Sequence, residues 1–411
     1  MQHPVEQVFR AERDRVLAAL VRFLGDLDLA EESAQDALVA ALERWPRDGI
    51  PQRPAAWLLT TAKHRAIDRI RRQQNFASKQ HLLVQHQADA DDPAALLADS
   101  SDIPDERLRL FFTCCHPALA QSAQVALTLR CLAGLSTGQI ARIFLTPEPT
   151  MAQRIVRAKR KIRDAGIPYR VPSAAELPGR LPGVLAVVYL VFTEGHGASA
   201  GPHLQDGALC DEGIRLARVL HGLLPDQGEV AGLLALLLLT DARRPARVDD
   251  RGRLVPLERQ DRSRWRTAML DEGRNLLLAT IRAVPAGPYT VQAAIAAVHA
   301  DAAQAAQTDW AQVVVLYDRL QQLAPSPVVD LNRAVAVAMA QGPEAGLAEL
   351  DKLVDEGSLL LHHLLPACRA DLLRRLGRTG AAAAAYRQAL ELVGNDVERG
   401  YLLDRLREVG G

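Results

Sequence analysis

The stretch SAQVALTLRCLAGLSTGQIARIFLTPEPTMAQRIVRAKRKIRD, residues 122–164, indicates most clearly how this chain folds. Its apolar residues recur at helical spacing, and Gly134 suits the end of a helix that covers residues 124–132. Ser136 and Gln139 form a capping-box pattern, and Thr146 before Pro147 is typical of a further helix start. The pattern therefore predicts a helix, a short second helix and a third helix that runs to about residue 164.

The third of these helices has one apolar side and one basic side. Met151, Ile155, Ala158 and Ile162 are spaced by four, three and four residues, which keeps them on one inward face. A short helix followed by a basic helix is the arrangement that reads the major groove of DNA, although a solvated basic face is the plainer alternative. The residues that we predict to contact DNA here are Thr150, Gln153, Arg154, Arg157, Arg160 and Lys161.

The charge of the chain is zero overall but unevenly distributed. The 411 residues hold 49 basic and 49 acidic side chains. Residues 63–79 contain six basic residues and one acid, residues 142–170 contain eight basic residues and two acids, and residues 89–106 contain seven acids and no base. Two basic segments separated by an acidic one favour a nucleic-acid partner that the zero sum conceals.

Cysteine usage and hydropathy indicate the compartment. The five cysteines form no CxxC pair, which is typical of a reducing cytosol. The first residues have no apolar core of a signal peptide, and the longest apolar run, residues 233–239, is far shorter than the roughly 20 residues that span a bilayer. We therefore expect a soluble cytoplasmic protein without a membrane partner.

The N-terminal segment predicts three helices. A helix over residues 5–24 is followed by Asp28 and Glu31 in a capping-box pattern, which predicts a second helix with acids in its first turns. Pro54 begins a third, strongly basic helix, PAAWLLTTAKHRAIDRIRRQQ, with few aromatic residues. Because stacking area is scarce, this helix is not expected to open duplex DNA unaided, and Trp57 is expected in the core.

The rest of the chain predicts an all-α fold in several parts. We expect a helical unit at 1–80, an acidic linker at 81–106, the helix-turn-helix unit at 107–172, a helical extension at 173–287 and repeats at 288–411. Segments 310–323, 344–355 and 380–393 recur at roughly 35 residues, near the period of tetratricopeptide (TPR) repeats. An irregular helical bundle is the alternative.

These motifs resemble the sigma-70 family of RNA polymerase sigma factors. Ala30-Glu31-Glu32-x-x-Gln35-Asp36 resembles the core-binding signature of region 2, and the run from Trp57 to Arg72 resembles regions 2.3 and 2.4. Residues 135–163 resemble region 4. The absence of a region 3 between them is similar to extracytoplasmic-function (ECF) sigma factors, and residues 112–117, 192–195, 241–246 and 260–265 resemble the ECF42-like subgroup, which has a fused helical extension.

The resemblance implies partners and site residues. Core RNA polymerase, chiefly its β′ subunit, would be contacted by Glu31, Glu32, Gln35, Asp36 and Leu38. The −10 promoter element would be contacted by Lys63, His64, Arg65, Asp68, Arg69, Arg71 and Arg72, and the −35 element by the basic helix described above. His64 stands where the family usually has Asn, and Gln139 where it usually has Glu.

Enzymatic and metal-dependent functions find little support in the sequence. Adjacent cysteines such as Cys114 and Cys115 rarely chelate one ion, and the chain has no GxxxxGK[ST] or GxGxxG phosphate loop. Glu194, His196 and Asp241 could line a small-molecule pocket, but a buried polar network is the preferred interpretation. We therefore predict no catalytic residue, no metal and no cofactor.

The predicted function is that of a sigma factor that directs core polymerase to promoters. Its extension would control exposure of the DNA- and polymerase-binding faces or stabilise the promoter complex, and could bind a regulatory protein. Two alternatives remain at this stage. One is a helix-turn-helix regulator with a TPR-like ligand- or partner-binding domain, and the other is a TPR-type scaffold with a degenerate sigma module.

Overall fold

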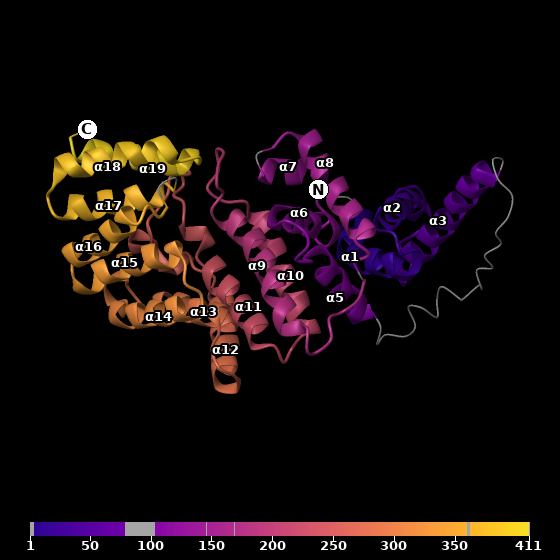
Figure 1. The fold of residues 1–411 in the computed structure, drawn as a ribbon, viewed down its shortest axis with the longest axis horizontal. Helices are drawn as coiled ribbons and strands as arrows, with labels where there is room; N and C mark the ends of the chain where they lie inside the picture. The colour runs from indigo at the N-terminus through magenta and orange to yellow at the C-terminus, as the bar shows by residue number, and fades with distance from the viewer. Residues whose placement is uncertain (1–3, 79–102, 145, 168, 360–361, 411) are drawn as a thin grey trace. The chain divides into compact units, whose positions relative to one another are not determined.

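The computed structural model describes residues 4–78, 103–144, 146–167, 169–359 and 362–410 (Figure 1). The expected all-α fold is confirmed, because every extended regular element among these residues is a helix. Two isolated β-bridges, Gly201 with Asn395 and Val248 with Leu254, are the β-structure found in the described part of the chain. The chain divides into two compact units, a first unit at Met1–Val188 and a second unit at Tyr189–Gly411.

The first three helices pack on one another around an aliphatic core. Leu17, Leu58 and Leu59 are fully buried in it, and Trp45 meets Trp57 edge to face with ring centroids 5.4 Å apart. The N-cap of the second helix is Asp26, whose carboxylate accepts from the backbone N–H groups of Asp28 and Leu29, so the predicted cap at Asp28 is wrong by two residues. The helices are α1 (Pro4–Leu24), α2 (Leu27–Asp48) and α3 (Pro54–Ser78).

Residues 122–164 fold into the predicted succession of helices. Gly134 has φ +73°, a left-handed conformation that glycine adopts without strain, just after the first of them. The Ser136–Gln139 capping box is present in both directions, at 2.8 and 3.2 Å. The predicted Thr146 cap is wrong, since the last helix starts at Glu148 without a side-chain cap. The helices are α5 (Ile103–Cys114), α6 (Gln121–Cys131), α7 (Thr137–Ile143) and α8 (Glu148–Asp164).

Helix α9 (Leu177–His196) contains the boundary between the two units. Among the described helices it is the one whose length and apolar composition would allow it to cross a membrane. The longest unbroken apolar run of the sequence lies elsewhere, at residues 233–239. Helix α9 contains no run of that length, because polar residues, including Tyr189, and glycines interrupt its apolar residues. Its residues Val184, Val187 and Val188 are fully buried.

The second unit continues with helices around a very apolar central helix. Residues 230–239 of that helix, α11, are all buried, which explains why they include the longest apolar run in the sequence. The elements are α10 (Gly207–Leu223), α11 (Gly228–Asp241), α12 (Thr267–Ala283) and α13 (Pro288–Asp301), with short 3₁₀ turns at Arg244–Ala246, Leu257–Arg259, Arg262–Arg264 and Ala305–Gln307.

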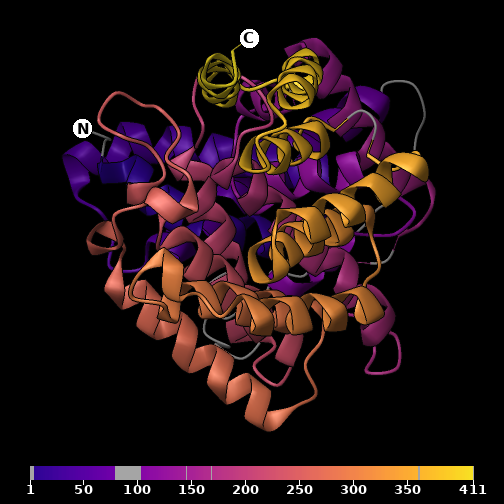
Figure 2. The same cartoon turned by 90° about the vertical axis from the view of Figure 1, so that its left-hand side faces the viewer.

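The C-terminal helices form stacked pairs, seen in orange to yellow in Figures 1 and 2. Helices α14, α16 and α18 match the three segments that recur in the sequence. Gly346 allows α16 to approach α15 closely, because a Cβ there would overlap the Ala338 side chain. The helices are α14 (Trp310–Leu323), α15 (Pro327–Gln341), α16 (Pro343–Asp355), α17 (Leu364–Arg375), α18 (Thr379–Leu392) and α19 (Asp396–Glu408).

Candidate nucleic-acid and polymerase interface

Helix α8 presents the basic surface that the sequence predicts. Its inward face is made by Met151, Ile155 and Ala158, which are buried. The predicted DNA contacts Thr150, Gln153, Arg157, Arg160 and Lys161 are exposed. Arg154 is half-buried, with its guanidinium 5.4 Å from the centre of the Phe144 ring. The packing of α8 therefore leaves a polar and basic face in solvent, which also includes the exposed side chain of Val156.

Helix α3 presents a smaller basic surface than expected. His64, Arg65, Asp68 and Arg71 are exposed. Lys63 is only 4% exposed, and its ammonium lies 4.7 Å from the centre of the Phe23 ring, so it belongs to the packing between α1 and α3. The side chain of Arg72 lies outside the described residues.

Arg69 faces α2 rather than open solvent. It forms an ion pair with Glu32 and lies 3.9 Å from a carboxylate oxygen of Asp36. All three side chains remain at least 38% exposed to water, so the pairs contribute little to stability. A predicted −10 residue and two predicted polymerase-binding residues therefore lie next to each other.

Helix α2 has an outward face that mixes polar and apolar residues. Glu32, Gln35 and Leu42 are exposed, and Val39 is 54% exposed. Asp36 and Leu38 are half-buried. Exposed aliphatic groups beside carboxylate and amide groups on one helical face are suited to docking on a protein partner.

Glu31 is the predicted polymerase-binding residue that the structure places inward. Its side chain is 5% exposed and lies between α1, α6 and α8. It forms an ion pair with Arg130, accepts from the Lys159 ammonium at 2.8 Å, and lies 3.6 Å from Arg13. Lys159 also donates to Asp28 at 2.7 Å. Sequence reasoning missed Arg13, Arg130 and Lys159, because each lies on another helix and no local spacing pattern links it to Glu31.

The groups in this cluster stabilise one another's charged forms. Burial opposes the charged form of Lys159, but the Coulomb attraction of Glu31 and the hydrogen bonds to Asp28 and Glu31 outweigh it and raise the lysine pKa. Lys159 is therefore a cation at neutral pH, although its side chain is only 9% exposed. Removing one member would leave the others buried without compensation.

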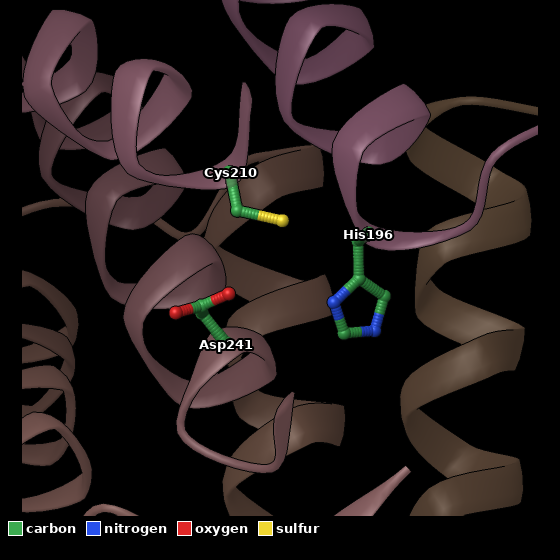
Figure 3. A group of neighbouring side chains, drawn as sticks. All are labelled: His196, Cys210 and Asp241. Atoms are coloured by element: carbon green, nitrogen blue, oxygen red, sulfur yellow. The ribbon is translucent and has the colours of Figure 1, made fainter. Parts of the chain in front are cut away.

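A second polar cluster lies in the second unit, where α9, α10 and α11 meet. Figure 3 shows the Cys210 sulfur and the Asp241 carboxylate facing the His196 ring. Their ligand atoms lie within 4.8 Å of one another, so a metal ion is the first chemistry to consider.

The surroundings of this cluster disfavour a metal ion. Asp241 is fully buried, and its Oδ2 already accepts from Arg266 at 2.9 Å and lies 3.0 Å from Arg244. Burial and the positive charges of Arg247, Arg243 and Arg244 hold the pKa of His196 well below its usual range. An added cation would meet several guanidinium groups that the single carboxylate does not neutralise. The geometry supports the buried polar network that the sequence favoured.

The adjacent cysteines singled out in the sequence are packing residues. Cys114, Cys115 and Cys131 are buried, and burial raises the pKa of the Cys115 thiol to about 12. A thiol with this pKa is a poor nucleophile at neutral pH. His362 and His363 stack on each other in the C-terminal repeats.

Three family models match consecutive parts of the chain. Residues 8–76 match "Sigma-70 region 2" and residues 112–162 match "Sigma-70, region 4". Residues 180–281 match a family of unknown function, DUF6596. The two sigma matches coincide with α1–α3 and with the helix-turn-helix of α5–α8.

One of the relatives matches nearly the whole chain, and others match less than half of it. An uncharacterized protein of Rhizobium meliloti (strain 1021) is 44% identical over 397 residues, which is 95% of this chain and 92% of the relative. The ECF RNA polymerase sigma factor SigK of Mycobacterium ulcerans (strain Agy99) is 30% identical over 175 residues, 39% of this chain and 90% of SigK. This chain belongs to the ECF family of RNA polymerase sigma factors. SigK of Mycobacterium tuberculosis (strain H37Rv) is also 30% identical, over 80% of its length.

The assignment decides among the functions left open by the sequence. A sigma factor binds core RNA polymerase and promoter DNA in transcription initiation, and the helix-turn-helix regulator is not favoured, because both sigma regions match. The SigK relatives share only the sigma part with this sigma factor, whereas the Rhizobium relative shares the extension as well. No solved structure matches the chain significantly.

Proposed function

We propose that this sigma factor docks on core polymerase, chiefly its β′ subunit, through the outward face of α2. That face offers Glu32, Gln35, Asp36 and Leu38, together with the exposed aliphatic side chains of Val39 and Leu42. The exposed basic residues of α3 then face the −10 element, and those of α8 face the −35 element. The chain itself catalyses no reaction and acts in the cytoplasm.

One observation carries the proposal. Two separate basic helices, α3 and α8, each bury an apolar side and expose a cationic side, and an acidic and aliphatic helical face lies beside the first of them. Neither DNA contact needs high affinity by itself, because binding to one polymerase makes the two contacts intramolecular. Cationic side chains on DNA phosphates release counterions, so promoter binding should weaken as salt rises.

A run-off transcription assay with purified core polymerase tests this proposal. The full-length protein should start transcripts at defined promoters, and Arg157→Ala should reduce them by about tenfold or more through loss of base contacts at the −35 element. Arg319→Ala, on α14 of the second unit, is the matched control and should leave transcripts unchanged. DNA binding without promoter-specific transcripts would contradict the proposal.

We further propose the domain organisation expected from the sequence, with the linker at 81–106, the helical extension at 173–287 and the repeats at 288–411. We also propose that the chain belongs to the ECF42-like subgroup. The extension would regulate the sigma part, with a groove in the second unit as the contact for a regulatory protein. The groove has a volume of about 500 Å³ and is lined by parts of residues 249–259 and 396–408. Leu403, 38% exposed on α19, lines it.

Leu403→Glu tests the regulatory role. It should change promoter-specific transcript levels without changing the affinity for core polymerase, since the substitution lies in the second unit. Unchanged transcript levels in cells, at promoters that respond to the sigma factor, would contradict the proposed regulatory role of the groove.

A further inference from the structure

The ion cluster around Glu31 joins the two sigma domains to each other, and we call it the Glu31 latch. Its members are Arg13, Asp28, Glu31, Arg130 and Lys159. Arg13, Asp28 and Glu31 come from region 2, whereas Arg130 and Lys159 come from region 4. The latch therefore connects the domain expected at the −10 element with the domain expected at the −35 element.

Backbone contacts reinforce the latch. Arg13 donates to the carbonyl oxygens of Arg130 at 2.8 Å and Cys131 at 3.2 Å. The Tyr169 hydroxyl, just beyond α8, donates to the Ala18 carbonyl oxygen at 3.0 Å. Region 4 is thus held against α1 and α2 by polar groups from α6, α8 and the segment after α8.

This arrangement is too compact for a promoter. The names of the two elements place them about 25 base pairs apart, which is about 85 Å of duplex at about 3.4 Å per base pair. In the structure Lys159 of α8 donates a hydrogen bond to Glu31 of α2, and α2 packs along α3 (Figure 1). Because each helix is only about 10 Å thick, α3 and α8 lie much closer together than the two promoter elements. The two DNA-facing helices cannot reach both elements in this state.

We propose that the Glu31 latch keeps the free sigma factor in a closed state, and that loading onto core polymerase and promoter DNA requires the latch to open. This inference rests on the proposed function of the two domains. The 24 residues from 79 to 102 give a covalent reach of about 80 Å at about 3.3 Å per residue, which suffices for separation.

The chemistry of the latch suits release. Two carboxylates face three cations, and the groups that separate regain strong hydration when the domains part, which offsets much of the electrostatic cost of breaking these ion pairs. Opening also frees Asp28 and Glu31 at the start of α2, beside the proposed polymerase-docking face. Polymerase could then replace the internal cations of the latch with its own basic groups.

Lys159→Gln tests the latch without altering either proposed interface, because Lys159 lies off the exposed face of α8. The distance between regions 2 and 4 is measured by energy transfer between dyes at Arg44→Cys and Ala165→Cys, with Cys368→Ser to remove the one native cysteine that is not fully buried. Lys159→Gln should lengthen this distance without polymerase, and should lower by about tenfold the protein concentration needed for half-maximal run-off transcription. Lys159→Arg should stay close to the unchanged protein.

The control is Lys352→Gln, which removes the lysine of an exposed pair with Glu349 in the second unit and should change neither readout. An unchanged distance in Lys159→Gln would overturn the latch. If Lys159→Gln does not fold by circular dichroism, Asp28→Asn makes the same test, since it removes one of the two partners of Lys159. If the distance lengthens but neither protein binds polymerase, the latch stands and the proposed function fails.

Discussion

The two units of this sigma factor each contain a buried carboxylate surrounded by cations, and the two clusters differ in what they connect. Glu31 in the first unit joins region 2 to region 4, because its partners Arg130 and Lys159 come from distant parts of the chain. Asp241 in the second unit joins helices and turns of a single continuous domain, with Arg244 three residues away and Arg266 nearby in sequence. The same chemistry therefore closes a separable contact in one case and stabilises a permanent fold in the other.

The difference lies in what happens when the cluster breaks. When the latch opens, its residues move into water together with their whole domains. The free-energy cost of opening is therefore mainly the loss of the contact between regions 2 and 4. Asp241 is enclosed by the helices that carry the apolar core of its domain, so its partners cannot reach water unless that domain unfolds.

The largest effect should come from Asp241→Ala. It leaves Arg244 and Arg266 without their shared buried carboxylate and should lower the free energy of unfolding of the second unit by about 3 kcal/mol. Urea unfolding followed by hydrogen exchange in α10–α12 measures it. Asp301→Ala removes an exposed partner of Arg274 and should cost only about 0.5 kcal/mol. Equal effects of the two substitutions would show that the buried ion pairs of Asp241 stabilise the second unit no more than an exposed pair does.

Glu31→Gln should act on the domain contact rather than on either domain. It keeps the shape of the side chain but leaves Arg130 and Lys159 facing a neutral group, which should weaken the contact between α2 and α8 by about 2 kcal/mol. Hydrogen exchange should rise at the contact surfaces of α2 and α8, while the cores of both domains keep their protection. Global unfolding of region 2 instead would show that the cluster is structural.

Acid should destabilise the second unit through His299, a half-buried histidine with a lowered pKa. Burial and the positive charges of Arg243 and Arg262 lower the pKa of His299 to about 4, from an ordinary 6.5, and the edge of the Trp310 ring contacts it as well. The unfolded chain therefore binds the proton first as pH falls, so this part of the stability is present above about pH 6.5 and is lost as pH falls toward about 4. His299→Asn should flatten the dependence of urea midpoints on pH, whereas His203→Asn, at an exposed site, should not.

A smaller effect than those of Asp241→Ala and Glu31→Gln should come from a local interaction within region 4. Ser136→Ala removes the side-chain acceptor of the capping box before α7 and should cost about 1 kcal/mol. Thermal unfolding of the sigma part measures it. Thr146→Ala is the matched comparison, and because Thr146 caps no helix in the structure, it should cost less than Ser136→Ala.

Local patterns explain which expectations held. The capping box of Ser136 and Gln139 and the buried face of α8 were predicted correctly, because each depends on residues three or four positions apart. The helices α14, α16 and α18 were predicted from helical spacing together with a recurrence at roughly 35 residues. The N-cap of α2 was misplaced from Asp26 to Asp28, because both carboxylates stand near the start of the helix and the backbone decides which one caps it.

The sequence by itself determined the all-α fold, the helix-turn-helix and the sigma-70 family, since these depend on short spacings and on motifs that hold their residues close together. Tertiary structure alone decided which polar residues are exposed. Lys63 lies over the Phe23 ring and Glu31 lies in the latch, although their neighbours His64 and Glu32 are exposed. The reason is physical. A charged side chain can be buried only where another helix supplies a counter-charge or an aromatic ring, and the residues next to it in the sequence do not indicate which helix that is.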